Sequence, residues 1–139
     1  MGEWREFDTT ADTGIEVWGN NVNDLFATAG KAFTMMTTDP DTIRLDCSKR
    51  IEIDSRGLDL QLRDFLNELL YLLDTEDLLP IDFHTFEHNV DGFSCTAVFC
   101  KWIKGISESR TEIKAVTYHM LEAERQENGV YYGKVVFDI

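Results

Sequence analysis

The sequence predicts an α+β fold in which two amphipathic helices pack on antiparallel β-sheet within a single domain, residues 1–139. Two kinds of pattern predict this fold. The stretch 58–79 repeats apolar residues at helical spacing, whereas several shorter segments alternate polar and apolar residues around turn signals such as Asp91-Gly92 and Asn128-Gly129. The chain has 139 residues, of which 43% are hydrophobic, and this is the size and composition of one hydrophobic core.

The first part of the chain is predicted to form two strands and a helix. Glu3–Asp8 and Thr13–Gly19 alternate with period two, and a polar loop rich in side-chain oxygens joins them. Asn21 or Asn23 is then expected to cap an amphipathic helix. The apolar side of this helix consists of Leu25, Phe26, Ala29, Phe33 and Met36.

The middle of the chain is predicted to hold the central helix of the fold. Asp39-Pro40-Asp41 ends the first helix, and Ile43–Leu45 with Ile51–Ile53 then forms either a strand pair or one long strand. We expect Asp59 to cap the central helix, and Pro80 to mark the point where the helical pattern has given way. The buried face of this helix should consist of Leu62, Phe65, Leu66, Leu69 and Leu73.

A hairpin is predicted after the central helix, from Ile81–Val90 and Phe93–Ile103, with Asp91-Gly92 as its turn. His84 and His88 lie four residues apart in its first strand. On a strand that spacing corresponds to about 13 Å, which is too far for two ligands of one metal ion. We therefore interpret both histidines as surface or partner-facing residues.

The end of the chain is predicted to form a second hairpin, Thr111–Gln126 with Val130–Ile139, closed by Asn128-Gly129. A two-residue Asn-Gly turn would place Glu127 opposite Val130 and would fix every residue pair farther from the turn.

If this register continues along both strands away from the turn, it places several charged groups close together at the end of the chain. It places His119 directly opposite Asp138, beside the terminal carboxylate of Ile139. Asp12, in the loop between the first two strands, supplies a further carboxylate. Lys114 is expected about 13 Å along the strand from the residue that pairs with Ile139. The long side chain of Lys114 partly bridges this distance.

Asp12, Asp138 and the terminal carboxylate of Ile139 supply only oxygen ligands, and these suit a hard divalent cation, calcium first, with magnesium or manganese as alternatives. Spacing alone does not bring Asp12 to the last strand. The alternative reading is a solvated lysine and ordinary turn aspartates. The sequence contains no glycine-rich phosphate loop and no signature of a serine hydrolase, zinc protease or EF-hand, so it offers little support for an autonomous enzyme.

Composition narrows the classes of partner. The chain has 26 acidic and 13 basic residues and a formal charge of −13, so strong direct binding to nucleic acid is not expected and a basic protein or cations fit better. The same charge is also explained by solubility alone. Its 3 cysteines form no Cys-x-x-Cys pair, which fits the reducing cytoplasm. No apolar run approaches the length of a membrane span, and no signal segment is evident.

Four stretches of the chain closely resemble the archease family. They are TTADTGIEVWG (9–19), FLNELLYLLDTE (65–76), EIKAVTYHMLE (112–122) and the ending KVVFDI (134–139), in the order in which that family has them. One departure is visible, because archeases commonly carry His before Thr-Ala-Asp and this chain has Thr9.

The resemblance implies an accessory protein, not itself an enzyme, for the GTP-dependent RNA ligase of tRNA splicing and RNA repair. Such a protein promotes guanylylation of the histidine in the ligase active site and allows repeated turnover. By motif match, Asp12, Asp138 and Ile139 are expected to bind metal, and Lys114 is expected to be essential. The predicted register adds His119 as a supporting group. The alternatives are an autonomous metal-dependent phosphohydrolase that uses the same carboxylates, and a chaperone-like module that binds protein without metal.

Overall fold

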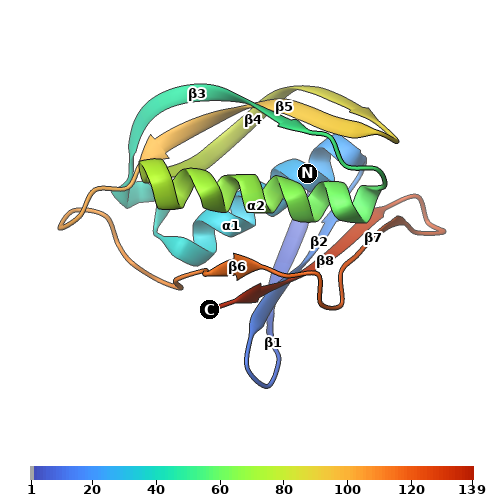
Figure 1. Cartoon of the computed structure of the whole chain (residues 1–139), viewed down its shortest axis with the longest axis horizontal. Helices are drawn as coiled ribbons and strands as arrows, with labels where there is room; N and C mark the ends of the chain where they lie inside the picture. The colour runs from blue at the N-terminus through green and yellow to red at the C-terminus, as the bar shows by residue number, and fades with distance from the viewer. Residues whose placement is uncertain (1) are drawn as a thin grey trace.

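Two antiparallel sheets enclose a pair of helices in the computed structural model, which describes residues 2–139 (Figure 1). One sheet is formed by β1 (Glu3–Asp8), β2 (Thr13–Gly19), β6 (Ala115–Val116), β7 (Glu122–Arg125) and β8 (Tyr131–Asp138). The other is formed by β3 (Arg44–Ile53), β4 (Leu78–Asn89) and β5 (Gly92–Lys101). The helices are α1 (Val22–Thr37) and α2 (Leu58–Glu76), with a short 3-10 turn at Pro40–Thr42 after α1. The predicted α+β fold with two amphipathic helices on antiparallel sheet is confirmed.

Helix α1 agrees closely with its prediction. Asn21 is the N-cap, and its side-chain oxygen accepts a hydrogen bond of 2.8 Å from the backbone N–H of Asp24. All five residues expected on the apolar side of α1 are buried. The ring of Phe26 stacks on that of Phe93 from β5, with centroids 4.0 Å apart. Helix α1 therefore links the N-terminal strands to the opposite sheet.

Helix α2 has the expected buried face but different ends. Four of its five predicted core residues are fully buried, and Leu73 is half-buried against the core. The prediction that Asp59 caps the helix is wrong, because Gly57 occupies the N-cap position with a φ of 93°, and Asp59 instead accepts a hydrogen bond from the N–H of Leu60. The helix ends at Glu76, where Asp77 adopts a left-handed conformation with a φ of 56°.

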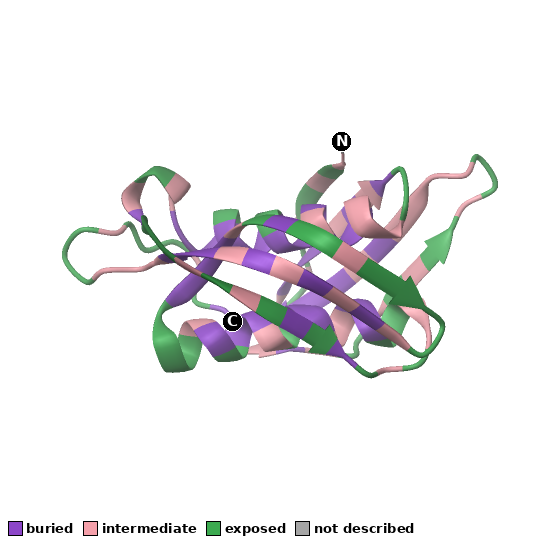
Figure 2. Cartoon of the chain, turned by 90° about the horizontal axis from the view of Figure 1, so that it is seen from above, coloured by how far each residue is buried: buried purple, intermediate pink, exposed green. Residues whose placement is uncertain are grey.

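The three-stranded sheet has the order β3-β5-β4 and covers one side of both helices. Arg44–Ile53 forms one long strand, which is one of the two predicted alternatives. The turn predicted at Asp91-Gly92 is wrong by one residue, because Asn89 pairs with Gly92 and the turn consists of Val90 and Asp91. Strand β4 begins at Leu78, earlier than expected, and includes Pro80, which is tolerated because β4 is an edge strand with a bulge after this residue. Buried and half-buried residues alternate along most of β5 (Figure 2).

The register predicted for the closing hairpin is wrong by one residue at its turn. The N–H of Gln126 bonds to the carbonyl of Val130 at 2.8 Å, so the loop has three residues and Gly129 takes a positive φ of 86°. Farther out, the chain leaves the sheet after Val116 and returns at Glu122, with Met120 at a φ of 53°. This excursion changes the register a second time.

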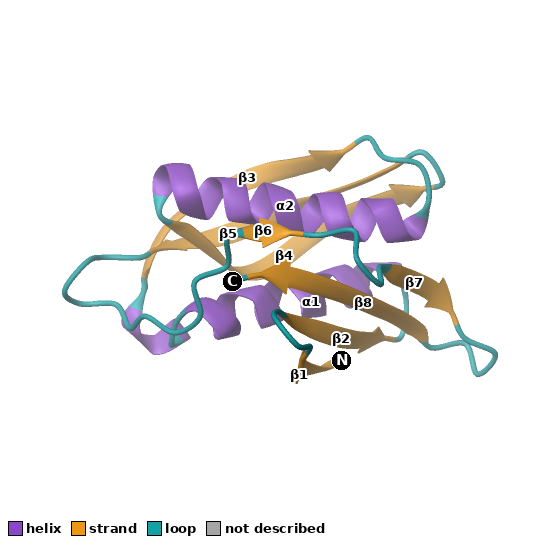
Figure 3. Cartoon of the chain, turned by 60° about the horizontal axis from the view of Figure 1, so that its bottom comes forward, coloured by secondary structure: helices purple, strands orange, loops and turns teal. Residues whose placement is uncertain are grey.

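Strand β8 is the organising strand of the five-stranded sheet. It pairs with β2 on one side and with both β6 and β7 on the other, and β1 pairs with β2 at the edge (Figure 3). Segments from both ends of the chain thus meet at the end of β8.

Candidate functional site

Asp12 and Asp138 are brought together by the pairing of β2 with β8. Thr13 lies opposite Phe137 at the last position of this pairing, so the next residues outward on the two chains are Asp12 and Asp138. Asp12 is half-buried and Asp138 is exposed. The pairing joins residues from opposite ends of the sequence, which explains why spacing could not predict it.

Lys114 reaches the same place from the other side of β8. Ala115 lies opposite Asp138, and the backbone N–H of Lys114 donates to the carbonyl oxygen of Asp138 at 2.7 Å. Lys114 therefore sits one step beyond the last ladder pair, beside Ile139, and not the length of four strand residues away as predicted. Its side chain is exposed and forms no ion pair with any described residue.

The predicted pairing of His119 with Asp138 is wrong. His119 is exposed in the segment that leaves the sheet between β6 and β7, where its N–H donates to the hydroxyl of Thr117 at 3.2 Å. Ala115 takes the place opposite Asp138. His119 is therefore not a ladder neighbour of this carboxylate.

We call Asp12, Lys114, Asp138 and Ile139 the terminal cluster. Its acidic part comprises two side-chain carboxylates and, at Ile139, a terminal carboxylate at the end of a paired strand. All these donors are oxygen atoms, so their chemistry fits a hard divalent cation and not a soft one. Within residues 2–139 no three His, Cys, Asp or Glu side chains group as a metal site.

The loop that carries Asp12 is held by a residue that the sequence prediction overlooked. Asp12 donates its backbone N–H to the hydroxyl of Thr9 at 3.1 Å, and its carbonyl accepts from the N–H of Thr9 at 2.9 Å. The available signal was the Thr-x-x-Asp spacing, because threonine hydroxyls commonly bond to backbone groups of nearby turn residues. Thr9 is also the position at which the chain departs from the archease-like pattern.

The histidines of β4 do not form a metal pair. Both are exposed, as predicted, and a bulge with Thr85 at a φ of 57° interrupts the strand between them. One ring nitrogen of His88 lies 3.0 Å from the side-chain oxygen of Gln61, and burial lowers the pKa of His88. His84 contacts the hydroxyl of Thr85 at 2.8 Å. Each histidine thus has its own local partner.

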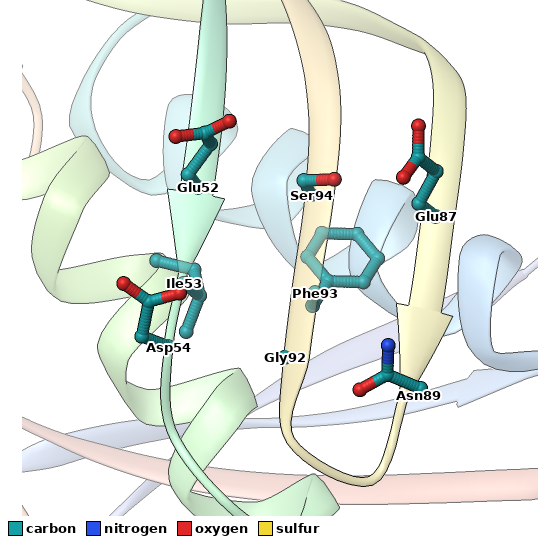
Figure 4. A pocket seen from close by; sticks show the side chains of 8 residues that line it. All are labelled: Glu52, Ile53, Asp54, Glu87, Asn89, Gly92, Phe93 and Ser94. Carbon is teal, nitrogen blue, oxygen red and sulfur yellow. The ribbon is translucent and has the colours of Figure 1, made fainter.

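A polar depression lies on the other sheet, apart from the terminal cluster. Glu52, Ser94 and Glu87 stand side by side on β3, β5 and β4 along its upper edge (Figure 4). Arg50 bonds to the hydroxyl of Ser94 at 2.8 Å and lies 3.5 Å from a carboxylate oxygen of Glu87. This guanidinium already compensates part of the acidic charge. Because the two sheets lie on opposite sides of the helices, the depression does not contribute to the terminal cluster (Figure 1).

Residues 4–139 match the model of the Archease protein family (MTH1598/TM1083). The chain belongs to the archease family. A protein archease from Methanothermobacter thermautotrophicus is 34% identical over 135 residues, which cover 96% of each chain. A protein archease from Archaeoglobus fulgidus is 31% identical over 99% of each chain.

Solved structures agree with this assignment to the archeases. The solution structure of protein 1598 from Methanobacterium thermoautotrophicum has a TM-score of 0.80 and 33% identity, covering 98% of each chain. A crystal structure from Thermotoga maritima, described as an archease and possible chaperone, has a TM-score of 0.67 and 25% identity over 96% of this chain and 94% of that one. Neither helix of the present archease, as described within residues 2–139, has the length and apolar character needed to cross a membrane.

Proposed function

We propose that this archease is an accessory protein of a GTP-dependent RNA ligase, and that it acts through the terminal cluster. Membership of the archease family supports the class of protein, and the observation that carries the proposal is the meeting of Asp12, Lys114, Asp138 and Ile139 at the end of β8. These residues come from three segments distant in sequence. They place carboxylates and one ammonium group at a projecting end of the sheet, where another protein can reach them.

Charge favours a partner of this kind. An enzyme that grips RNA should present a basic surface around its active site, and a chain of net charge −13 is attracted to such a surface. The terminal cluster would enter the nucleotide cleft of the ligase, while the rest of the acidic surface guides the approach.

Within that cleft the cluster has two tasks. Asp12, Asp138 and the terminal carboxylate of Ile139 would hold a divalent cation, calcium first among hard cations, which when bound neutralises charge on the triphosphate of GTP. The ammonium of Lys114 would contact phosphate oxygens directly, as a compact cation with three donors. Both tasks orient GTP for attack by the ligase histidine, so guanylylation and repeated turnover become faster. The role implies a cytoplasmic protein, and the 3 free cysteines suit that reducing compartment.

The test is multiple-turnover ligation of RNA ends by the ligase with GTP, measured with and without this chain. Wild-type protein should raise turnover and should hydrolyse neither GTP nor phosphoesters by itself. Asp12→Asn, Lys114→Gln and Asp138→Asn should each abolish the stimulation. The matched control is Glu127→Gln, which removes an exposed carboxylate in the hairpin loop at the opposite end of β8.

Two results would overturn the proposal. Metal-dependent hydrolysis by the isolated chain would favour the phosphohydrolase alternative. Full stimulation by the Asp12→Asn and Asp138→Asn variants would show that the protein acts through another surface, as a chaperone-like binder would.

A further inference from the structure

The loop between β1 and β2 leaves Asp12 just outside the sheet. The last ladder pair of these strands is Asp8 with Thr13, and Thr13 is also the outermost β2 residue paired with β8. Among the residues that the structure describes, Asp12 therefore has no ladder partner on either side. A residue in this position needs another restraint if its side chain is to keep one direction.

Thr9 supplies that restraint through both of its polar groups. Its backbone N–H donates to the carbonyl of Asp12 at 2.9 Å, and its hydroxyl accepts from the N–H of Asp12 at 3.1 Å. The same hydroxyl lies 3.3 Å from the carbonyl of Asp12, to which it can donate its proton. Both backbone groups of Asp12 are thus bonded to a single residue.

The surroundings of Thr9 favour a stable contact. Thr9 is half-buried, whereas Thr10 and Ala11 at the apex of the loop are exposed. Its β-branched side chain has few rotamers, which keeps the hydroxyl in place. The base of the loop is fixed independently, because the hydroxyl of Thr13 lies 3.1 Å from both the carbonyl of Phe7 and a carboxylate oxygen of Asp8.

We infer that Thr9 is a positioning residue, whose hydroxyl fixes the backbone of Asp12 and so directs its carboxylate toward the other members of the terminal cluster. This inference rests on the proposed function, because it assigns Thr9 a role in the site formed by Asp12 and Asp138. Without the hydroxyl the loop keeps its length, its flanking pairs and the bond from the N–H of Thr9 to the carbonyl of Asp12, but the N–H of Asp12 loses its partner and the residue rotates more freely about its backbone torsions. Its carboxylate then spends less time where a shared cation requires it.

The experiment compares Thr9→Val, which keeps the shape and removes the hydroxyl, with Thr9→Ser, which keeps the hydroxyl. Thr10→Val is the matched control, because Thr10 is the exposed neighbour. Amide hydrogen exchange of Asp12, followed by NMR without added metal, should be at least about tenfold faster in Thr9→Val and unchanged in the other two variants. Calcium affinity by calorimetry should fall about tenfold in Thr9→Val alone, the usual scale for residues that orient metal ligands. Ligase stimulation should follow calcium affinity.

The outcomes separate this inference from the proposed function. If Asp12→Asn abolishes calcium binding and stimulation while Thr9→Val retains both, Thr9 is not a positioning residue and the proposed function stands. If Asp12→Asn is itself without effect, the proposed function fails. A lower melting temperature of Thr9→Val with unchanged calcium affinity would show a purely structural role and would overturn the inference. Should Thr9→Val not fold, Thr9→Ala provides the same comparison.

Discussion

Glu16 shows how single residues tune charge on the face of the five-stranded sheet that is turned away from the helices. One carboxylate oxygen accepts a hydrogen bond of 2.6 Å from the hydroxyl of Tyr132, and the other accepts one of 2.7 Å from Arg5. These partners lower the pKa of Glu16, with the Tyr132 hydrogen bond as the largest cause. Burial and the same bond raise the pKa of Tyr132, so its hydroxyl stays a donor across the usual pH range.

The variant Tyr132→Phe should destabilise the protein by about 1 kcal/mol at pH 7, because it removes a hydrogen bond to a charged acceptor at a partly exposed site. A carboxyl with a lowered native pKa contributes stability above its unfolded pKa and loses it as pH falls through the native value. The difference in the free energy of unfolding between variant and wild type should therefore become smaller below about pH 4. Urea unfolding at several pH values measures it. Tyr131→Phe, whose hydroxyl makes no hydrogen bond among the described residues, is the control, and a pH-independent difference would contradict the assignment.

Ile139 offers the most direct test of the terminal carboxylate. Appending one glycine replaces that charge with a neutral amide and moves it by about 3.3–3.6 Å, more than a calcium shell with ligand distances of about 2.3–2.6 Å can absorb. Calcium affinity and ligase stimulation should both fall, while the melting temperature should hardly change because Ile139 is exposed. One glycine added at the N-terminus is the control. Unchanged affinity in the extended protein would leave Asp12 and Asp138 as the whole acidic part of the site.

At the scale of elements, α2 should contribute most to stability. Leu66 and Leu69 are fully buried between the two sheets, whereas Leu60, on the same helix, is 39% exposed. Leu69→Ala should lower the free energy of unfolding by about 2–5 kcal/mol, and Leu60→Ala by much less. Denaturant titration measures both. At temperatures where Leu69→Ala remains folded, this variant should stimulate the ligase as well as the wild type does. A loss of stimulation in the folded variant would place α2 in the site.

The elements themselves were largely predictable from the sequence. Helix α1 and strands β1 and β2 have the expected residues because their patterns are local, and Asn21 caps its helix as its side chain predicts. The boundaries of α2 were harder to predict from the sequence. Leu78 and Leu79 continue the apolar pattern of the helix, yet both belong to β4, because the left-handed Asp77 ends the helix before them.

The candidate site was less predictable, because it depends on register and on non-local pairing. Asn128-Gly129 is compatible with a two-residue turn as well as with the three-residue loop that forms. The residues Thr117–Leu121 show no sequence pattern that predicts where the chain leaves the sheet. The error put His119 opposite Asp138 and Lys114 too far away. Asp12 was assigned to the site only by resemblance, since no local pattern reveals that β2 pairs with β8.

The whole molecule is arranged so that its second strand and its last strand are neighbours in one sheet. Strand β8 lies between β2 and the pair β6 and β7, and the other sheet packs on the far side of the helices (Figure 1). The terminal cluster therefore rests on paired strands from both ends of the chain. The four-residue loop with Asp12 and the end of β8 lie just beyond the last paired residues of this support, which allows the cluster to contact a partner without disturbing the core.

The net charge of −13 should govern how fast the protein meets a basic partner. Electrostatic steering raises association rates by roughly 10–1000-fold and is screened by salt, so the association rate with the ligase should fall steeply between low and high KCl. Stopped-flow fluorescence measures this rate. Asp12→Asn/Asp138→Asn and Glu124→Gln/Glu127→Gln each remove two charges, the first pair at the terminal cluster and the second at the opposite end of β8. Because field lines concentrate where the cluster enters the cleft, the first double variant should reduce the salt dependence of the association rate more than the second double variant. Equal slopes for the two double variants would mean that the acidic surface attracts the partner as a whole, without orienting the terminal cluster toward it.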